Sequence, residues 1–125
     1  DLNKHTAAHI YKAAQEGIAF AFRYGLDIMR ENKLEPSVIK AGQANLFLSP
    51  VFTHAFVNAT GVPVALYNVE GSVGAALGAG IGAGIYKELK DAFADTKPIQ
   101  RIEPTETKLY NALYENWKDK LVKFI

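Results

Sequence analysis

The sequence predicts an α/β fold in which long helices surround a short parallel βαβ unit. The stretch 38–50 has the pattern of a strand, a turn and a helix start, and the alternating apolar run 62–67 follows that helix as a second strand. Two strands joined through one helix are expected to pair in parallel, with a right-handed crossover. Amphipathic helical patterns precede and follow this unit, which completes the α/β assignment.

The composition is that of one ordinary globular domain, because 125 residues with 49% hydrophobic and 22% charged side chains can bury a single core. The formal net charge is +1 and no block of like charge occurs, so we expect neither nucleic acid nor a membrane surface as a partner. The longest apolar run, 71–86, is mostly Gly and Ala and is shorter than the roughly twenty residues of a membrane span. The chain has no cysteine, which suits the reducing cytoplasm, our expected location. Because the first residue is Asp1 and not methionine, we also expect a piece of a longer protein.

The first expected element is one long amphipathic helix over residues 4–32. Its apolar and small residues recur at three- and four-residue steps and form one stripe: Ala7, Ile10, Ala14, Gly17, Ile18, Ala21, Gly25 and Ile28. A polar linker follows over 33–37, and Pro36 in it disfavours helix at the residue before it. The first strand is then expected over 37–41.

The second helix is expected over 49–60 and has clear signals at both ends. Ser49 is a preferred N-cap residue, and Pro50 suits the first helical position because its missing N–H would have no partner there. Gly61 stands where a left-handed residue usually ends a helix. The second strand, 62–67, follows directly.

A third helix is expected over 70–94, with a break near Tyr86, and Glu70 would favour its first turn. Its first half is rich in glycine, and each glycine costs about 1 kcal/mol relative to alanine inside a helix. Gly74, Gly78 and Gly82 lie four residues apart, which predicts close approach of a neighbouring element on that face.

The chain is then expected to continue as a linker over 96–104 and a last amphipathic helix over 105–123. The apolar stripe that should pack this helix on the domain comprises Leu109, Ala112, Leu113, Trp117, Leu121 and Phe124.

The strand-turn-helix corner is the best candidate for a binding site, because such a turn directs free amides and a helix N-terminus outward at the end of a strand. The alternative is a corner with no ligand, which is the commoner case in α/β proteins. The glycine string 78–84 matches neither G-x-G-x-x-G nor the P-loop pattern, so tight helix packing is its favoured interpretation.

The histidines and carboxylates predict no catalytic centre. His5 and His9 are spaced to share a metal but lack a third ligand nearby, so we interpret them as surface residues. His54 has no motif that offers it a nucleophile, and no two acidic residues form an evident acid–base pair. No complete active site can be assembled from this chain.

Four blocks of the sequence resemble, in order and spacing, the C-terminal domain of the FGGY carbohydrate kinases, and among these the xylulokinases most. The blocks are AQEGIAFA (14–21), AGQAN with LSP (41–50), GVPV (61–64) and EGSVGAALGA (70–79). The resemblance extends over nearly the whole chain to about Tyr86. It implies a partial ribonuclease H-like domain of the actin and hexokinase group, whose first three antiparallel strands are absent from this chain.

The resemblance implies that the corner binds the adenosine part of ATP. The expected contacts are the backbone of Ala41, Gly42, Gln43, Ala44 and Asn45, with Ser49 facing the adenine or ribose. The family's adenosine motif is usually two or three glycines followed by Ala-Lys-Ser-Pro, whereas only Gly42 remains here and the turn is two or three residues longer. Which amide meets which nucleotide atom therefore stays open.

Two functions follow as alternatives. The first is the nucleotide-binding C-terminal portion of an ATP-dependent, Mg²⁺-requiring kinase that converts a ketopentose, D-xylulose, to xylulose 5-phosphate. The resemblance places the phosphate loop and most sugar contacts in the missing N-terminal domain and the catalytic Asp upstream of the first residue here, so this fragment alone should be inactive. A homodimer is an open possibility. The second is a stand-alone α/β interaction or regulatory module.

Overall fold

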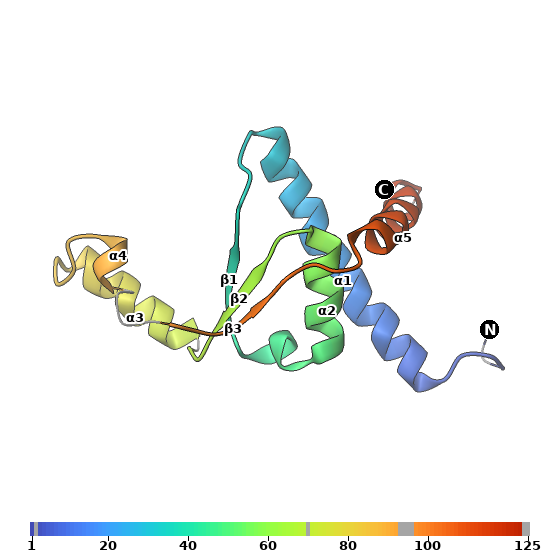
Figure 1. Ribbon diagram of the computed structural model, residues 1–125, viewed down its shortest axis with the longest axis horizontal. Helices are drawn as coiled ribbons and strands as arrows, with labels where there is room; N and C mark the ends of the chain where they lie inside the picture. The colour runs from blue at the N-terminus through green and yellow to red at the C-terminus, as the bar shows by residue number, and fades with distance from the viewer. Residues whose placement is uncertain (2, 70, 93–96, 124–125) are drawn as a thin grey trace.

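The computed structural model describes residues 1, 3–69, 71–92 and 97–123. Three strands form one small sheet beside a group of helices, and a helical arm extends away from this body (Figure 1). The elements in chain order are α1 (Ala7–Glu31), β1 (Ile39–Gly42), a short 3₁₀ helix η1 (Asn45–Leu48), α2 (Pro50–Thr60), β2 (Val64–Tyr67), α3 (Gly71–Gly82), α4 (Leu89–Ala92), β3 (Pro98–Ile102) and α5 (Thr107–Val122).

The sheet has the order β1-β2-β3 and contains the predicted parallel βαβ unit. β1 pairs with β2 in parallel, with Ile39 opposite Val64, and α2 connects the two strands. The segment 96–104 was expected to be a linker, and this prediction is wrong, because β3 runs antiparallel to β2 with Ile102 opposite Val64. β3 is an edge strand with mostly exposed side chains, so it lacks the apolar alternation that marks a buried strand.

α2 forms the centre of the hydrophobic core, and both of its predicted end signals are confirmed. The Ser49 hydroxyl accepts a hydrogen bond from the amide of Phe52, and Gly61 ends the helix in the left-handed conformation with φ +67°. The buried residues that join α2 to β2, α1 and α5 include Phe52, Ala55, Phe56, Val57, Ala59, Val64, Leu66, Ala19, Phe20, Tyr110 and Tyr114.

The apolar stripe that the sequence identifies on α1 is mostly exposed in the described structure, although such a stripe ordinarily faces the core. Ile10, Ile18 and Ile28 keep between 38% and 56% of their surface accessible. The residues of α1 that are buried, Ala19, Phe20 and Leu26, lie outside the stripe. Periodicity identified an apolar face of α1 correctly, but the described part of the chain packs mainly against another face.

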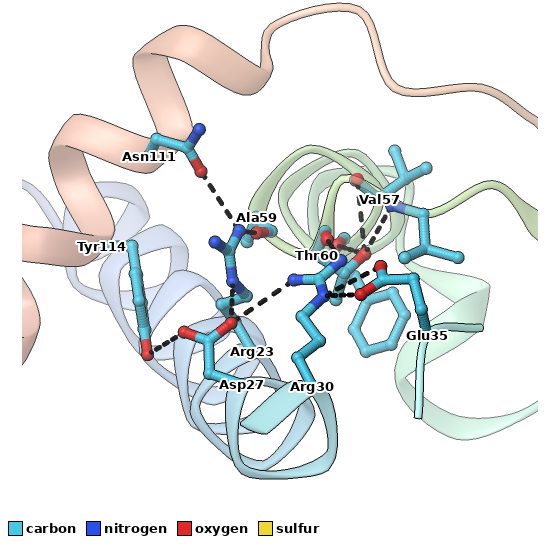
Figure 2. Close-up of polar contacts among 11 residues, drawn as sticks. Arg23, Asp27, Arg30, Glu35, Val57, Ala59, Thr60, Asn111 and Tyr114 are labelled. Atoms are coloured by element: carbon cyan, nitrogen blue, oxygen red, sulfur yellow. Dashed lines mark hydrogen bonds and ion pairs between the residues drawn. The ribbon is translucent and has the colours of Figure 1, made fainter. Parts of the chain in front are cut away.

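That other face of α1 is held by a cluster of polar side chains (Figure 2). Asp27 lies at its centre and accepts hydrogen bonds from Arg23 Nε at 2.7 Å and from the Tyr114 hydroxyl at 2.8 Å. Arg23 also donates to the carbonyl of Ala59, and Arg30 donates to the carbonyl of Thr60 at 3.1 Å. These carbonyls end α2, where cations are favourable because of the helix dipole. The cluster therefore ties α1, α2 and α5 together.

α5 packs through Trp117 of the predicted stripe and also through side chains that the stripe did not contain. Phe124 of that stripe lies outside the described residues. Tyr110 and Tyr114 are buried, whereas Leu109 and Leu113 remain 54% and 38% exposed. The fully buried side chain of Asn58 positions the start of this helix, because its Oδ1 accepts from the amides of Thr105 and Glu106 at 2.8 and 2.6 Å. These hydrogen bonds to Asn58, and that of Tyr114 to Asp27, orient α5 so that its tyrosine side chains face the core.

α3 and α4 form the arm that projects from the body in Figure 1, and the predicted break between them is confirmed. The tight packing expected around Gly74, Gly78 and Gly82 is wrong for the described residues, since a Cβ at any of the three would meet no atom within 4 Å. The predicted contribution of Glu70 to the first turn lies outside the described residues. No helix in the described part of the chain has the length and apolarity needed to cross a membrane.

Candidate functional site

The predicted binding turn leaves the carboxyl end of β1, where ligands of parallel α/β sheets commonly bind. The Gln43 amide donates to the carbonyl of Tyr67 at 2.8 Å, which fixes the turn to the end of β2. The Ala44 amide donates to the carbonyl of Gly42 at 2.8 Å, so the chain reverses sharply there. Asn45 then adopts φ +51° and starts η1. Asparagine tolerates this left-handed conformation better than most residues do, a local signal that the prediction from sequence missed.

Only part of the turn's backbone is available to a ligand. The amides of Gln43 and Ala44 are used within the protein, whereas the amides of Asn45 and Leu46 have no acceptor among the residues that the structure describes. These two N–H groups are the backbone donors that an oxygen or a ring nitrogen could reach. Leu46 was not among the predicted contacts, and the predicted contacts of 41–45 with a nucleotide stay a prediction.

Gly42 has a structural role that the sequence did not reveal. A Cβ at this position would overlap the carbonyl oxygen of Val69, in the segment that follows β2. A side chain here would force the backbone to shift. The sequence predicted that a nucleotide comes close to the backbone of Gly42. In the described structure, the group close to Gly42 is the carbonyl of Val69. The predicted approach of a nucleotide to Gly42 is untested.

Ser49 is likewise engaged within the protein. Its hydroxyl donates to Gln15 Oε1 of α1 at 2.6 Å and accepts from the Phe52 amide at 3.4 Å. The hydroxyl therefore caps α2 and connects it to α1. Its predicted contact with the adenine or ribose is untested.

A pocket of about 270 Å³ lies beside the turn, between η1, the start of α2 and strands β2 and β3. Apolar side chains form much of its lining, and the polar groups come from Gln43, Thr53, His54 and Gln100. Pockets that enclose a whole drug-sized ligand hold about 300–1,000 Å³, so this one suits a single ring system. Its lining residues are Gln43, Phe47, Leu48, Pro50, Thr53, His54, Leu66, Gln100 and Ile102.

The sequence did not predict Gln100 as a site residue, because Gln100 lies in the segment 96–104 that was expected to be a linker. Gln100 pairs with Leu66 across β2 and β3, so it faces the same side of the sheet as Leu66. A prediction of Pro98–Ile102 as a strand paired with β2 would have placed the Gln100 side chain at the pocket.

His54 belongs to a polar cluster at the rim of the pocket. Its Nε2 lies 3.3 Å from Glu106 Oε2, and its Nδ1 lies 3.4 Å from the Tyr110 hydroxyl. That hydroxyl donates to Glu16 Oε1 at 3.4 Å. Burial, together with the nearby Glu16 carboxylate, raises the pKa of Tyr110 to about 12, so the phenol stays protonated and can donate. The groups connect α1, α2 and α5, and no nucleophile lies among them.

Among the described residues, no three His, Asp or Glu side chains are arranged so that they could hold a metal ion. His5 and His9 are exposed, with ring centroids 5.5 Å apart. His9 Nδ1 accepts from the Thr6 amide at 3.0 Å and so helps to cap α1. These contacts agree with the surface interpretation of both histidines.

Known proteins that are similar to this chain include two sugar kinases, and no protein-family model matches the chain. L-xylulose/3-keto-L-gulonate kinase from Escherichia coli (strain K12) is 31% identical over 121 residues, which cover 91% of this chain and 24% of that protein. The crystal structure of xylulose kinase from Rhodospirillum rubrum matches 96% of this chain and 25% of its own, with a TM-score of 0.77 and 25% identity.

Both similarities confirm the resemblance to the C-terminal domain of the FGGY carbohydrate kinases, and the structural match confirms the α/β fold class. The chain spans about a quarter of the length of either relative.

Proposed function

We propose that this chain, which resembles the FGGY carbohydrate kinases in sequence and fold, is the nucleotide-binding C-terminal portion of an ATP-dependent kinase acting on a ketopentose. The observation that carries the proposal is the superposition of 96% of the chain on a xylulose kinase with a TM-score of 0.77. The sugar is a xylulose, with D-xylulose as the first substrate to test, and the product is xylulose 5-phosphate. Both relatives carry xylulose in their names, which supports the choice of sugar.

The residues at the carboxyl end of β1 fit an adenosine better than a triphosphate. Asn45 and Leu46 offer two free amides, and the adjoining pocket of about 270 Å³ has room for one base, with the amide side chains of Gln43 and Gln100 at its edge. Both side chains carry a donor and an acceptor, which suits the edge of a purine. ATP brings the phosphoryl group, and Mg²⁺ would balance its charge. We assign neither a Mg²⁺ ligand nor a catalytic residue to the described part of the chain.

The test is a titration of the ¹⁵N-labelled chain with ATP, followed through its amide signals. We expect shifts clustered at 41–49 and weak affinity, roughly millimolar or about −4 kcal/mol, because only adenosine contacts remain without the other domain. Shifts clustered at 78–84 would overturn the assignment in favour of the glycine-rich helix.

A matched pair of variants tests whether the backbone carries the binding. Asn45→Gly removes the side chain but keeps the left-handed conformation, whereas Asn45→Val strains it because a β-branched residue rarely adopts φ near +51°. We expect Asn45→Val to weaken ATP binding at least tenfold and Asn45→Gly to change it less than threefold. Equal losses would show that the Asn45 side chain makes the contact.

The kinase assignment is tested by an assay that couples ADP release to a colour change. The assay is run once with D-xylulose and once with L-xylulose as the substrate. A complete kinase that contains this chain should turn over one of the two sugars, and the isolated chain should turn over neither. Turnover by the isolated chain that persists after repurification would contradict the proposal.

A stand-alone interaction module is the second candidate. It is favoured by the internal use of the Gln43 and Ala44 amides and by the carbonyl of Val69 beside Gly42, since these features leave the turn fewer free donors than a nucleotide loop needs. A flat ATP titration together with an intact fold would favour this candidate.

A further inference from the structure

We infer that the pocket beside the turn accepts any purine base and does not distinguish the 6-amino group of adenine from the 6-oxo group of guanine or hypoxanthine. The choice of a nucleobase as the occupant rests on the proposed function. What is new is the class of nucleotide, purine nucleoside triphosphates and not ATP alone, and the residues that leave the choice of purine open.

Two of the four polar residues that line the pocket are engaged within the protein. The Thr53 hydroxyl donates its proton to the carbonyl four residues before it, at 3.0 Å. The Nε2 of His54 lies 3.3 Å from Glu106 Oε2, and its Nδ1 lies 3.4 Å from the Tyr110 hydroxyl. Both ring nitrogens therefore have partners within the protein. The polar side chains that remain for the edge of a base are the two glutamines of the lining.

These two glutamines can each present a donor or an acceptor. Gln43 comes from the turn after β1 and Gln100 from β3, and both residues are exposed. Their side-chain amides have no hydrogen-bond partner among the residues that the structure describes. An amide has an NH₂ donor on one side and an oxygen acceptor on the other, and a half-turn exchanges the two. Each side chain can therefore direct toward a base whichever group that base requires.

The purines differ at the edge that such amides would meet. Adenine has its 6-amino donor beside the acceptor N1, whereas guanine and hypoxanthine have the acceptor O6 beside the donor N1–H. A site with fixed, buried polar groups rejects the wrong order strongly, because the mismatch leaves a buried group unpaired. An exposed amide that can rotate is left unpaired by neither order, since water also reaches it. The cost of exchanging one purine for another is therefore small.

The rigid donors of the site match a feature that all three purines share. The backbone amides of Asn45 and Leu46 have no acceptor among the described residues, and a backbone N–H can only donate. Adenine, guanine and hypoxanthine all have the ring acceptors N3 and N7. The fixed part of the site thus suits every purine, and only the rotatable part meets the edge at which they differ.

The apolar lining selects for the size of the base. The Phe47 ring packs edge-on against Phe52 and Phe56, with centroids 5.3 and 5.2 Å apart, so its position is fixed by the core. A purine, with two rings, covers more of an apolar surface than a pyrimidine and gains more from leaving water. We therefore expect purines to bind better than pyrimidines. The apolar residues of the lining are Phe47, Leu48, Pro50, Leu66 and Ile102.

The test compares the dissociation constants of ATP, GTP, ITP and CTP for the ¹⁵N-labelled chain, measured from the amide signals of residues 41–49. All four nucleotides have the same ribose and triphosphate, so only the base differs. We expect GTP and ITP to bind within threefold of ATP, and CTP to bind more than threefold more weakly than ATP. A difference of more than threefold between ATP and either GTP or ITP would overturn the inference. Binding of CTP within threefold of ATP would also overturn it.

A substitution at Gln100 should create the discrimination that the parent lacks. Gln100→Glu replaces a group that can donate or accept with a carboxylate that only accepts. Guanine presents two adjacent donors, N1–H and the 2-amino group, whereas adenine presents only its 6-amino group. We expect the ratio of GTP affinity to ATP affinity to rise at least fivefold, although the added negative charge weakens the binding of both nucleotides.

Arg101→Gln is the matched control. Arg101 pairs with Ala65, so its side chain lies on the other face of β3, and its replacement makes the same change of one charge unit. The ratio of GTP affinity to ATP affinity should stay within twofold of that of the parent. Equal ratios in the two variants would overturn the inference. If Gln100→Glu does not fold, Gln43→Glu takes its place and is judged by the same ratio.

The same titrations separate failure of the inference from failure of the proposed function. If ATP shifts residues 41–49 and GTP binds more than threefold more weakly, the inference fails and the nucleotide-binding assignment stands. If none of the four nucleotides shifts these residues, the proposed function and the inference fail together.

Discussion

Replacing Asp27 should destabilise the protein more than replacing any exposed carboxylate of α1. Asp27 accepts three hydrogen bonds: from Arg23 Nε at 2.7 Å, from the Tyr114 hydroxyl at 2.8 Å and from Arg30 Nη1 at 3.3 Å. Hydrogen bonds to charged groups contribute about 1.5–3 kcal/mol each when buried, and the carboxylate is about a quarter exposed. Counting the two short bonds and allowing for this exposure, Asp27→Ala should lower the free energy of unfolding by about 2–4 kcal/mol.

The assay is thermal and urea unfolding. For a chain of this length, the loss corresponds to a fall in melting temperature of roughly 8–16 °C. Asp27→Asn should lower the free energy of unfolding by about half as much, because its Oδ1 can still accept a hydrogen bond from one donor. Glu31→Ala, on the exposed side of the same helix, is the matched control and should stay within about 0.5 kcal/mol of the parent.

The pH dependence of Asp27 provides a second readout of the same cluster. Burial alone would raise the pKa of Asp27, but hydrogen bonds from Arg23 and Tyr114 hold it below its ordinary value of 3.8. The stabilisation is therefore present above pH 3.8 and is lost as the pH falls through the lowered pKa. Asp27→Asn should flatten this acid limb. The reasoning is refuted if Asp27→Ala unfolds within about 0.5 kcal/mol of the parent and the acid limb is unchanged.

Three further predictions follow from individual positions. Gly78→Ala should stabilise the isolated chain by about 0.5–1 kcal/mol because the site is open, whereas Gly80→Ala should gain less because its Cβ would approach a tyrosine ring at 2.9 Å; thermal melts of both variants compare them. Gly42→Ala should cost about 1–3 kcal/mol in urea unfolding, since its Cβ would overlap the carbonyl of Val69, and a variant as stable as the parent would contradict that geometry. Burial and Glu16 raise the pKa of Tyr110 from 10 to about 12, so its stabilisation is complete below pH 10 and is lost as the pH rises toward 12; Tyr110→Phe should remove this alkaline loss from the unfolding profile.

Short-range chemistry made the βαβ unit predictable. Ser49 and Pro50 define the start of α2, and Gly61 defines its end, because capping depends only on adjacent residues. Two strands joined through one helix then leave few topologies, and the parallel pairing of β1 with β2 is confirmed. The position of the turn that carries the candidate site was predictable for the same reason, since the turn lies between a strand and a capped helix.

Long-range pairing accounts for what the sequence did not predict. β3 is defined by hydrogen bonds to β2, and its exposed side chains carry no alternating apolar signal, so Gln100 was not placed at the pocket. The free amides of Asn45 and Leu46 depend on which neighbouring amides the protein uses internally, and that depends on the carbonyl of Tyr67 at the end of β2. Neither fact can be derived from local spacing.

The two faces of α1 show why helical periodicity alone does not identify the buried face of a helix. The face that packs in the described structure carries Arg23, Asp27 and Arg30, and its polar groups find partners on α2 and α5. The apolar face, including Ile18 and Ala21, lines an apolar groove of about 750 Å³ beside β1. Helical periodicity identifies both faces of α1, but it cannot show which face the partners on α2 and α5 will cover, because those partners are distant in sequence. The hydrogen bonds of Arg23, Asp27 and Arg30 decide that question in the described structure.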